Sequence, residues 1–201
     1  TIIAAMLAFW QVVRARRFRR RADHDGLTGA LSRSAIEVKA AATFAAARRN
    51  VQPLSLLMFD MDNLKWINDS FGHARGDAAL KVVVRAITAT LPEGVAVARW
   101  GGDEFVALLP DVTKADSEGL RDQVADAIGQ ALLHAGFTNT GCSAGVATMT
   151  AQDASYDDLL ARADVALYEA KAANKKASTA READAAAIER ASDSETIQKI
   201  A

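Results

Sequence analysis

The stretch "RWGGDEFVALL" runs from Arg99 to Leu109 and combines glycines, carboxylates and an apolar run. Adjacent glycines and the adjacent carboxylates Asp103 and Glu104 stand at the start of an apolar run of strand length. Paired glycines between two apolar runs are typical of a β-hairpin. The glycines indicate a backbone that is either sharply bent or closely approached by a ligand. Charges at the start of a buried strand are costly unless something pairs with them.

Helices and strands alternate on either side of this hairpin. An Ala-rich stretch predicts a helix that begins near Ser32 or Ser34. The run "LSLLMF" predicts a strand that is buried on both faces and ends at Asp60. Further helices are predicted from Gly76 to Leu91, around 120–132 and over 156–173, with a strand over 138–150. The order predicts an α/β fold with a mixed central sheet flanked by helices.

Composition excludes several classes of protein. The chain has 201 residues, half of them hydrophobic, so it can bury a sizeable core. A formal net charge of −1 argues against a nucleic-acid-binding protein. The single cysteine, Cys142, excludes an internal disulfide and suits a reducing compartment. We expect this cysteine to be a buried packing residue.

The two ends of the chain differ in character from its middle. Residues 1–13 form a short apolar stretch with Trp10 near its end, and the Arg-rich segment 14–23 follows. This order predicts the end of a membrane-spanning helix, with the remainder in the cytoplasm at an inner membrane. The alternative is an amphipathic linker helix with coiled-coil spacing. The polar, Ala-rich tail 177–201 is a poor core-former, either a lone helix or disordered.

Acidic side chains gather at two predicted strand ends. Asp60 and Asp62 follow the buried strand, and Asp103 and Glu104 precede the strand that returns from the hairpin. If these strands are neighbours, their carboxylates converge at one edge of the sheet. Converging carboxylates repel unless a cation lies between them, and hard oxygen ligands favour Mg²⁺. Substrate phosphates commonly complete such a site.

The residues after Asp60 contain further groups suited to a nucleotide. Lys65 can neutralise phosphate, and the backbone N–H groups around Asn63 and Leu64 can surround it. Asn68 and Asp77 offer the acceptors and donor that a guanine edge requires. Singly, each signal has an ordinary structural explanation, such as a solvated hairpin tip or an Asp that caps a helix. Their joint occurrence in this order favours the functional interpretation.

The motifs together resemble those of the GGDEF-domain diguanylate cyclases, from about residue 24 to residue 176. Four blocks match in order: "DGLTG" (25–29), "DMDNLKWINDSFGHARGD" (60–77), "RWGGDEF" (99–105) and "ADVALYEAK" (163–171). The resemblance implies a fold similar to the palm of polymerases and class III nucleotide cyclases. It implies that two GTP molecules condense to cyclic di-GMP, with release of pyrophosphate, across a homodimer. The catalytic domain would then span 24–176.

By motif match, the resemblance also implies a metal site. Asp60 and Asp103 would bind Mg²⁺, or Mn²⁺ in its place, with help from the Met61 carbonyl. Glu104 would lie close to the metal. Asp103 is also the candidate base for the 3′-hydroxyl that attacks the α-phosphate.

The same resemblance assigns residues to the substrate. Asn68 and Asp77 would recognise guanine, whereas Lys65 and Lys171 would hold phosphates. Arg99 would support either the hairpin or the triphosphate. Relatives that accept ATP typically have serine at the position of Asp77, so we expect GTP as both substrates.

Some positions depart from the family pattern. Ala30 and Ser32 replace the usual Leu and Asn, which affects packing more than catalysis. After Lys171 the common Gly-Arg-Asn is replaced by Asn174, Lys175 and Lys176. Lys175 keeps the phosphate-binding charge but loses the bidentate geometry of arginine. Residues 92–95 lack the Arg-x-x-Asp of the inhibitory product site in many relatives, so we expect no feedback inhibition through that surface.

Two other functions compete with the enzyme. One is a GTP-binding signalling module without turnover, and the other is a structural dimerisation domain on a membrane stalk. The intact metal and guanine positions argue against the first. The second leaves clustered carboxylates without a partner cation.

Overall fold

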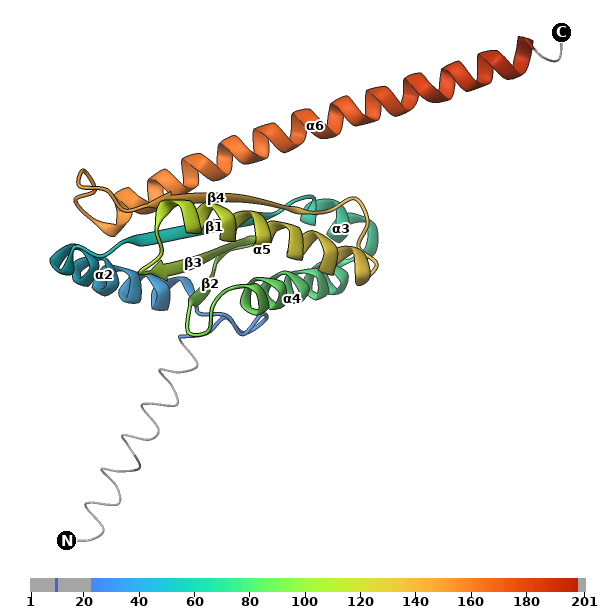
Figure 1. Cartoon of the computed structure of the whole chain (residues 1–201). Coiled ribbons are helices and arrows are strands. Elements are labelled where there is room, and N and C mark those ends of the chain that lie inside the picture. The colour runs from blue at the N-terminus through green and yellow to red at the C-terminus, as the bar shows by residue number, and fades with distance from the viewer. Residues whose placement is uncertain (1–9, 11–22, 199–201) are drawn as a thin grey trace, which may run out of the picture.

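The computed structural model describes Trp10 and residues 23–198, with the side chains of 177, 178 and 180–198 left out. Helices lie on both sides of a central sheet, and the last helix extends well beyond it (Figure 1). The elements follow in the order α2 (Arg33–Asn50), β1 (Leu54–Met61), α3 (Leu64–Phe71), α4 (His73–Thr90), β2 (Ala96–Gly101), β3 (Glu104–Pro110), α5 (Lys114–His134), β4 (Cys142–Thr148) and α6 (Tyr156–Gln198). The predicted α/β class is confirmed.

The sheet has the strand order β2-β3-β1-β4, and each pair of neighbouring strands is antiparallel. Strands β2 and β3 form the predicted hairpin. The sheet is thus antiparallel rather than mixed as predicted, and a parallel pairing occurs as an isolated bridge between Leu31 and Ala98. Strand β1 therefore lies between β3 and β4, so its Asp60 end has a neighbouring strand on each side.

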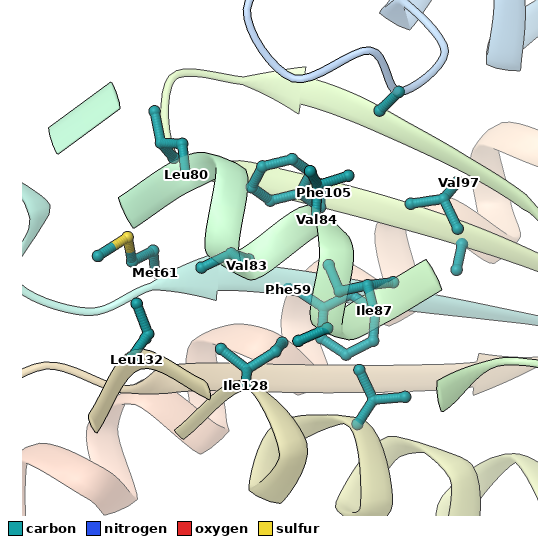
Figure 2. Packing of buried hydrophobic residues seen from close by; sticks show 14 of the residues in the cluster. Phe59, Met61, Leu80, Val83, Val84, Ile87, Val97, Phe105, Ile128 and Leu132 are labelled. Carbon is teal, nitrogen blue, oxygen red and sulfur yellow. The ribbon is translucent and has the colours of Figure 1, made fainter. Parts of the chain in front are cut away.

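Alternating side chains divide the core into two layers. Phe59 of β1 and Phe105 of β3 point toward α4 and α5, where they pack near Ile87 and Ile128 (Figure 2). The intervening residues of the same strands, such as Met58, pack against α2 and α6. Every residue of β1 is buried, as the continuous apolar run predicted. A sheet that is covered on both faces holds its strand ends in fixed positions.

Helix starts agree with the sequence at α2 and differ at α4. Ser32 caps α2, and its side chain accepts a hydrogen bond from the Ala35 N–H at 3.4 Å. The prediction that the helix over 76–91 opens at Gly76 was wrong, because α4 begins at His73 after Gly72, whose φ is 83°. Helix α3 was not predicted at all. Its eight residues give too short a pattern for the helical period to stand out.

Strand β4 and helix α6 approach each other unusually closely at Gly145. A Cβ at this position would lie 2.3 Å from the Leu167 backbone nitrogen and 2.5 Å from the Ala163 carbonyl oxygen. Only glycine fits without displacing the helix backbone. The close approach fixes how near α6 lies to the sheet, one helical turn before Lys171.

The structure describes only part of the two terminal segments that the sequence set apart. Of the predicted apolar helix 1–13, only Trp10 is described, and of the Arg-rich linker 14–23 only Asp23. Within the described residues, no helix is both long enough and apolar enough to cross the hydrocarbon core of a membrane. The membrane and inner-membrane assignments therefore stay predictions. The part of the tail over 177–198 continues α6, which begins at Tyr156, so it is not a separate helix.

Candidate functional site

Antiparallel pairing brings the end of β1 to the start of β3. Asp60 lies opposite Glu104 in the ladder, and the Met61 N–H donates to the Asp103 carbonyl at 3.1 Å. The structure therefore gathers Asp60, Asp103 and Glu104 at one edge of the sheet. The condition that the two carboxylate-bearing strands are neighbours is met.

Asp60 is the most buried member of this cluster. It is 6% exposed, and its Oδ2 atom lies 2.7 Å from Nζ of Lys171 on α6. Burial raises the pKa of Asp60 to about 6; the Lys171 bond opposes this rise, and the nearby charges of Asp103 and Glu104 add to it. The end of β1 thus carries a buried negative charge that attracts a cation.

Asp62 adds a second carboxylate from the same end of β1. Its Oδ1 accepts a hydrogen bond from the Ser143 hydroxyl at 2.9 Å, and Ser143 in turn accepts one from the Asn174 amide at 3.1 Å. Burial raises the pKa of Asp62, partly opposed by the Ser143 bond and by Lys171. Asn174, a departure from the family pattern, is therefore linked through β4 to the carboxylates. Nothing in the sequence spacing indicates this link.

Arg99 holds the hairpin turn. Its Nε and Nη2 atoms donate to the Gly102 carbonyl at 3.0 and 2.6 Å, and its Nη1 pairs with Asp25 at 3.3 Å. Asp25 also accepts from the Thr28 hydroxyl at 2.6 Å. Burial acts to raise the pKa of Asp25, but the Thr28 bonds and the Arg99 charge outweigh it and lower that pKa. Of the two predicted roles for Arg99, the structure places the side chain in hairpin support.

The paired glycines leave space beside the carboxylates. Gly101 and Gly102 do not belong to the glycines with positive φ, so left-handed backbone is not the reason for glycine here. A Cβ on Gly102 would meet nothing within 4 Å, whereas one on Gly101 would lie 3.1 Å from Glu104 Oε2. The chain nonetheless turns sharply at Gly102 and Asp103, between β2 and β3, and the open side of Gly102 leaves room for a ligand, so both explanations that the sequence offered stand.

Asn68 and Asp77 lie on the adjoining helices α3 and α4. Asn68 Oδ1 occupies the space beside Gly76, where a Cβ would lie only 2.0 Å from it. Asp77 follows Gly76 directly and is exposed. The short connection 62–63 joins these helices to the carboxylate cluster.

The predicted phosphate-binding lysines differ in how close they lie to the carboxylate cluster. Lys171 contacts the carboxylate cluster directly. Lys175 is exposed one helical turn further along α6, with no ion pair among the described residues. Lys65 is 89% exposed, and its nearest acidic partner is Asp69 at 3.9 Å, so it does not reach the cluster.

The donor set suits a magnesium ion that is shared with a substrate. Among the described residues, no three carboxylate, His or Cys side chains stand close enough together to enclose a metal. Magnesium does not require such a cage, since it is usually held by one or two carboxylates, phosphates and water. The carboxylates of Asp60 and Asp103 and the Met61 carbonyl are hard oxygen donors at one strand end that could hold such an ion. Glu104 lies near enough to influence the Asp60 charge.

Comparisons with known proteins agree with these motifs. The family model described as "Diguanylate cyclase, GGDEF domain" matches residues 22–177. The diguanylate cyclase DgcP of Pseudomonas aeruginosa is 34% identical over 159 residues, which are 78% of this chain and 24% of that protein. The cyclic di-GMP phosphodiesterase PdeB of Shewanella oneidensis is 37% identical over 155 residues, 76% of this chain and 18% of that protein.

A solved structure supports the same fold. The GGDEF domain of TpbB (YfiN) from Pseudomonas aeruginosa has a TM-score of 0.68 and 34% identity, and the match covers 74% of this chain and 88% of that one. The palm-like fold that the resemblance implied is therefore confirmed. The chain spans about a quarter of DgcP, so the activity of that whole protein does not transfer by likeness alone.

The raised pKa of Asp60 predicts a pH-dependent stability difference for Asp60→Asn. A carboxyl whose pKa rises on folding stabilises the folded state while protonated, and this contribution is lost as pH rises through the folded pKa. Relative to the variant, the wild-type protein should therefore lose up to about 3 kcal/mol of unfolding free energy between pH 4 and pH 7. Urea unfolding in metal-free buffer measures the difference.

The control for this comparison is Asp69→Asn, which removes an exposed surface carboxylate. Its difference from wild type should change little over the same pH range. A constant difference between Asp60→Asn and wild type across that range would show that Asp60 is not held in a desolvated site.

Proposed function

The chain belongs to the GGDEF-domain family of diguanylate cyclases, and on that premise we propose that it condenses two molecules of GTP into cyclic di-GMP with release of pyrophosphate. The observation that carries the proposal is the buried Asp60 beside Asp103 and Glu104 at the open glycine turn. A triphosphate-bound magnesium ion fits the charge, the ligand chemistry and the open space of this sheet edge.

In the proposed mechanism, Asp60, Asp103 and the Met61 carbonyl hold Mg²⁺, or Mn²⁺ in its place. The ion would neutralise charge on the triphosphate and on the attacking and leaving oxygens during in-line transfer. Asp103, in the turn and less buried than Asp60, accepts the proton of the 3′-hydroxyl. Arg99 keeps the turn in place by its bonds to the Gly102 carbonyl.

In the proposed complex, side chains on α3, α4 and α6 recognise the substrate. Asn68 and Asp77 bind the guanine edge, for which an amide and a carboxylate supply a donor and acceptors. Lys171 and Lys175 hold phosphates from successive turns of α6. Lys65 reaches a phosphate only when the nucleotide extends over the start of α3, beside the backbone N–H groups near Asn63.

One site holds one GTP, so bond formation requires two chains with their sites facing each other. A homodimer is therefore part of the proposal, and attachment to an inner membrane through residues 1–13, with the domain in the cytoplasm, stays a separate proposal. Residues 92–95 lack the Arg-x-x-Asp pattern, so we propose that the product does not inhibit through that turn.

The competing function is a GTP-binding signalling module without turnover. The chain is similar both to cyclases and to PdeB, whose name describes a phosphodiesterase, so the likeness alone does not select turnover. The lysine at position 175, in place of arginine, is also consistent with weaker triphosphate binding. Product formation distinguishes this module from the enzyme.

Asp103→Asn should abolish product formation. We expect the wild-type protein with GTP and Mg²⁺ to form cyclic di-GMP, and the variant to form it at least about 100-fold more slowly, because metal ligand and base are lost together. Chromatography of the reaction mixture measures the product. The matched control, Asp111→Asn, changes an exposed residue at the far end of the same strand and should keep the wild-type rate. A dimeric wild-type sample that binds GTP without forming product would favour the signalling module.

Gly76→Ala should weaken guanine recognition. Its methyl group would displace Asn68 Oδ1, so we expect about tenfold weaker GTP binding, a change of about 1.4 kcal/mol. In an Asn68→Ala background the clash with Asn68 disappears and a 3.2 Å approach to the end of the Leu64 side chain remains, so Gly76→Ala should have little further effect. The control Gly119→Ala places a methyl group in open space on α5 and should not alter binding. Equal losses from Gly76→Ala in both backgrounds would contradict a role through Asn68.

A further inference from the structure

The ammonium of Lys171 lies beside the Asp60 carboxylate, where a bound cation would also lie. Its nitrogen lies 2.7 Å from Asp60 Oδ2, and the Asp60 side chain is only 8% exposed. The nearby charges of Asp103 and Glu104 act on the same ammonium. Lys171 is thus the counter-ion of a buried carboxylate that would otherwise be unpaired.

The backbone keeps Lys171 close to this carboxylate. Gly145 of β4 admits the backbone of α6 at Leu167, which precedes Lys171 by one helical turn. Residues four apart on a helix share one face, so the close approach at Leu167 also directs Lys171 toward the sheet. Strand β4 pairs with β1 up to Met61 and therefore holds this contact beside Asp60.

The Lys171 side chain is also exposed enough to leave Asp60 for another anionic partner. Its side chain is 40% exposed, whereas that of Asp60 is buried, so the ammonium can leave without unfolding the helix. Lysine is a point charge on a flexible stem. The exposed Lys175 lies one turn further on the same helix. A triphosphate beside both lysines would offer Lys171 a new anionic partner.

We propose that Lys171 exchanges partners: it neutralises Asp60 while the metal position is empty, and it passes to the triphosphate when a divalent cation binds Asp60. This inference rests on the proposed function and extends it. Two cations compete for one carboxylate, so Lys171 opposes metal binding in the absence of nucleotide. The triphosphate removes that competition, and metal and nucleotide therefore bind cooperatively through Lys171.

The exchange predicts opposite effects of one substitution. Lys171→Met should bind Mn²⁺ about tenfold more tightly than the wild-type protein without nucleotide, because the competing cation is absent. The same variant should bind 3′-deoxy-GTP, which lacks the attacking hydroxyl, about tenfold more weakly. Electron paramagnetic resonance of free Mn²⁺ measures the first affinity, and calorimetry in the presence of Mg²⁺ measures the second.

Two further variants make the test specific. Lys175→Met should weaken 3′-deoxy-GTP binding without tightening Mn²⁺ binding, because Lys175 makes no ion pair with Asp60. Lys171→Gln keeps a hydrogen-bond donor near Asp60 without the charge, and should reproduce the opposite changes if Lys171→Met does not fold. Thermal unfolding of each variant checks the fold.

The outcomes separate this inference from the proposed function. Nucleotide binding that weakens in the Lys171 variants while Mn²⁺ affinity stays unchanged or falls would overturn the exchange and leave the proposed function standing. A folded wild-type protein that binds neither Mn²⁺ nor 3′-deoxy-GTP would overturn both.

Discussion

The ion pair between Asp60 and Lys171 joins the end of the central strand to the last helix and balances the most buried negative charge of the site. A carboxylate at the end of β1 is buried because the sheet is covered on both faces and β1 has a neighbour on each side. Such a group requires a cation, and two nearby carboxylates strengthen the requirement. The fold thus buries negative charge at the end of β1, and the ammonium of Lys171 pairs with it.

Two sets of contacts hold the residues around the carboxylate cluster in position. On one side, Asp25 and Arg99 fasten the 25–29 loop to the Gly102 carbonyl, so the hairpin turn is held by its own strand and by a distant loop. On the other side, Ser143 and Asn174 hold Asp62 against β4 and α6. The "DGLTG" block is therefore explained as a support for the hairpin, although it contributes no group to the carboxylate cluster.

Much of this structure follows from local patterns in the sequence. The capping serine of α2, the buried strand that ends at Asp60 and the glycine hairpin each have a short-range signal. The convergence of Asp60 with Asp103 depended on one long-range assumption, that their strands are neighbours, which the pairing of β1 with β3 satisfies.

Contacts between elements far apart in the chain were not predictable in the same way. The approach of Lys171 to Asp60 requires the depth of α6 on β4, which Gly145 sets through backbone atoms. The true start of α4 depends on the left-handed Gly72 and on Asn68, which fills the space beside Gly76. Local propensity does not predict this start of α4, because glycine is a poor helix former and the preceding helix α3 is short.

A crystal structure with Mn²⁺ and 3′-deoxy-GTP tests the central claim most directly, since this nucleotide can bind but cannot react. We expect anomalous density for manganese between Asp60 and Asp103, guanine against Asn68 and Asp77, and a Lys171 ammonium on the triphosphate rather than on Asp60. Manganese or nucleotide bound elsewhere, with the Asp60–Lys171 pair unchanged, would contradict it.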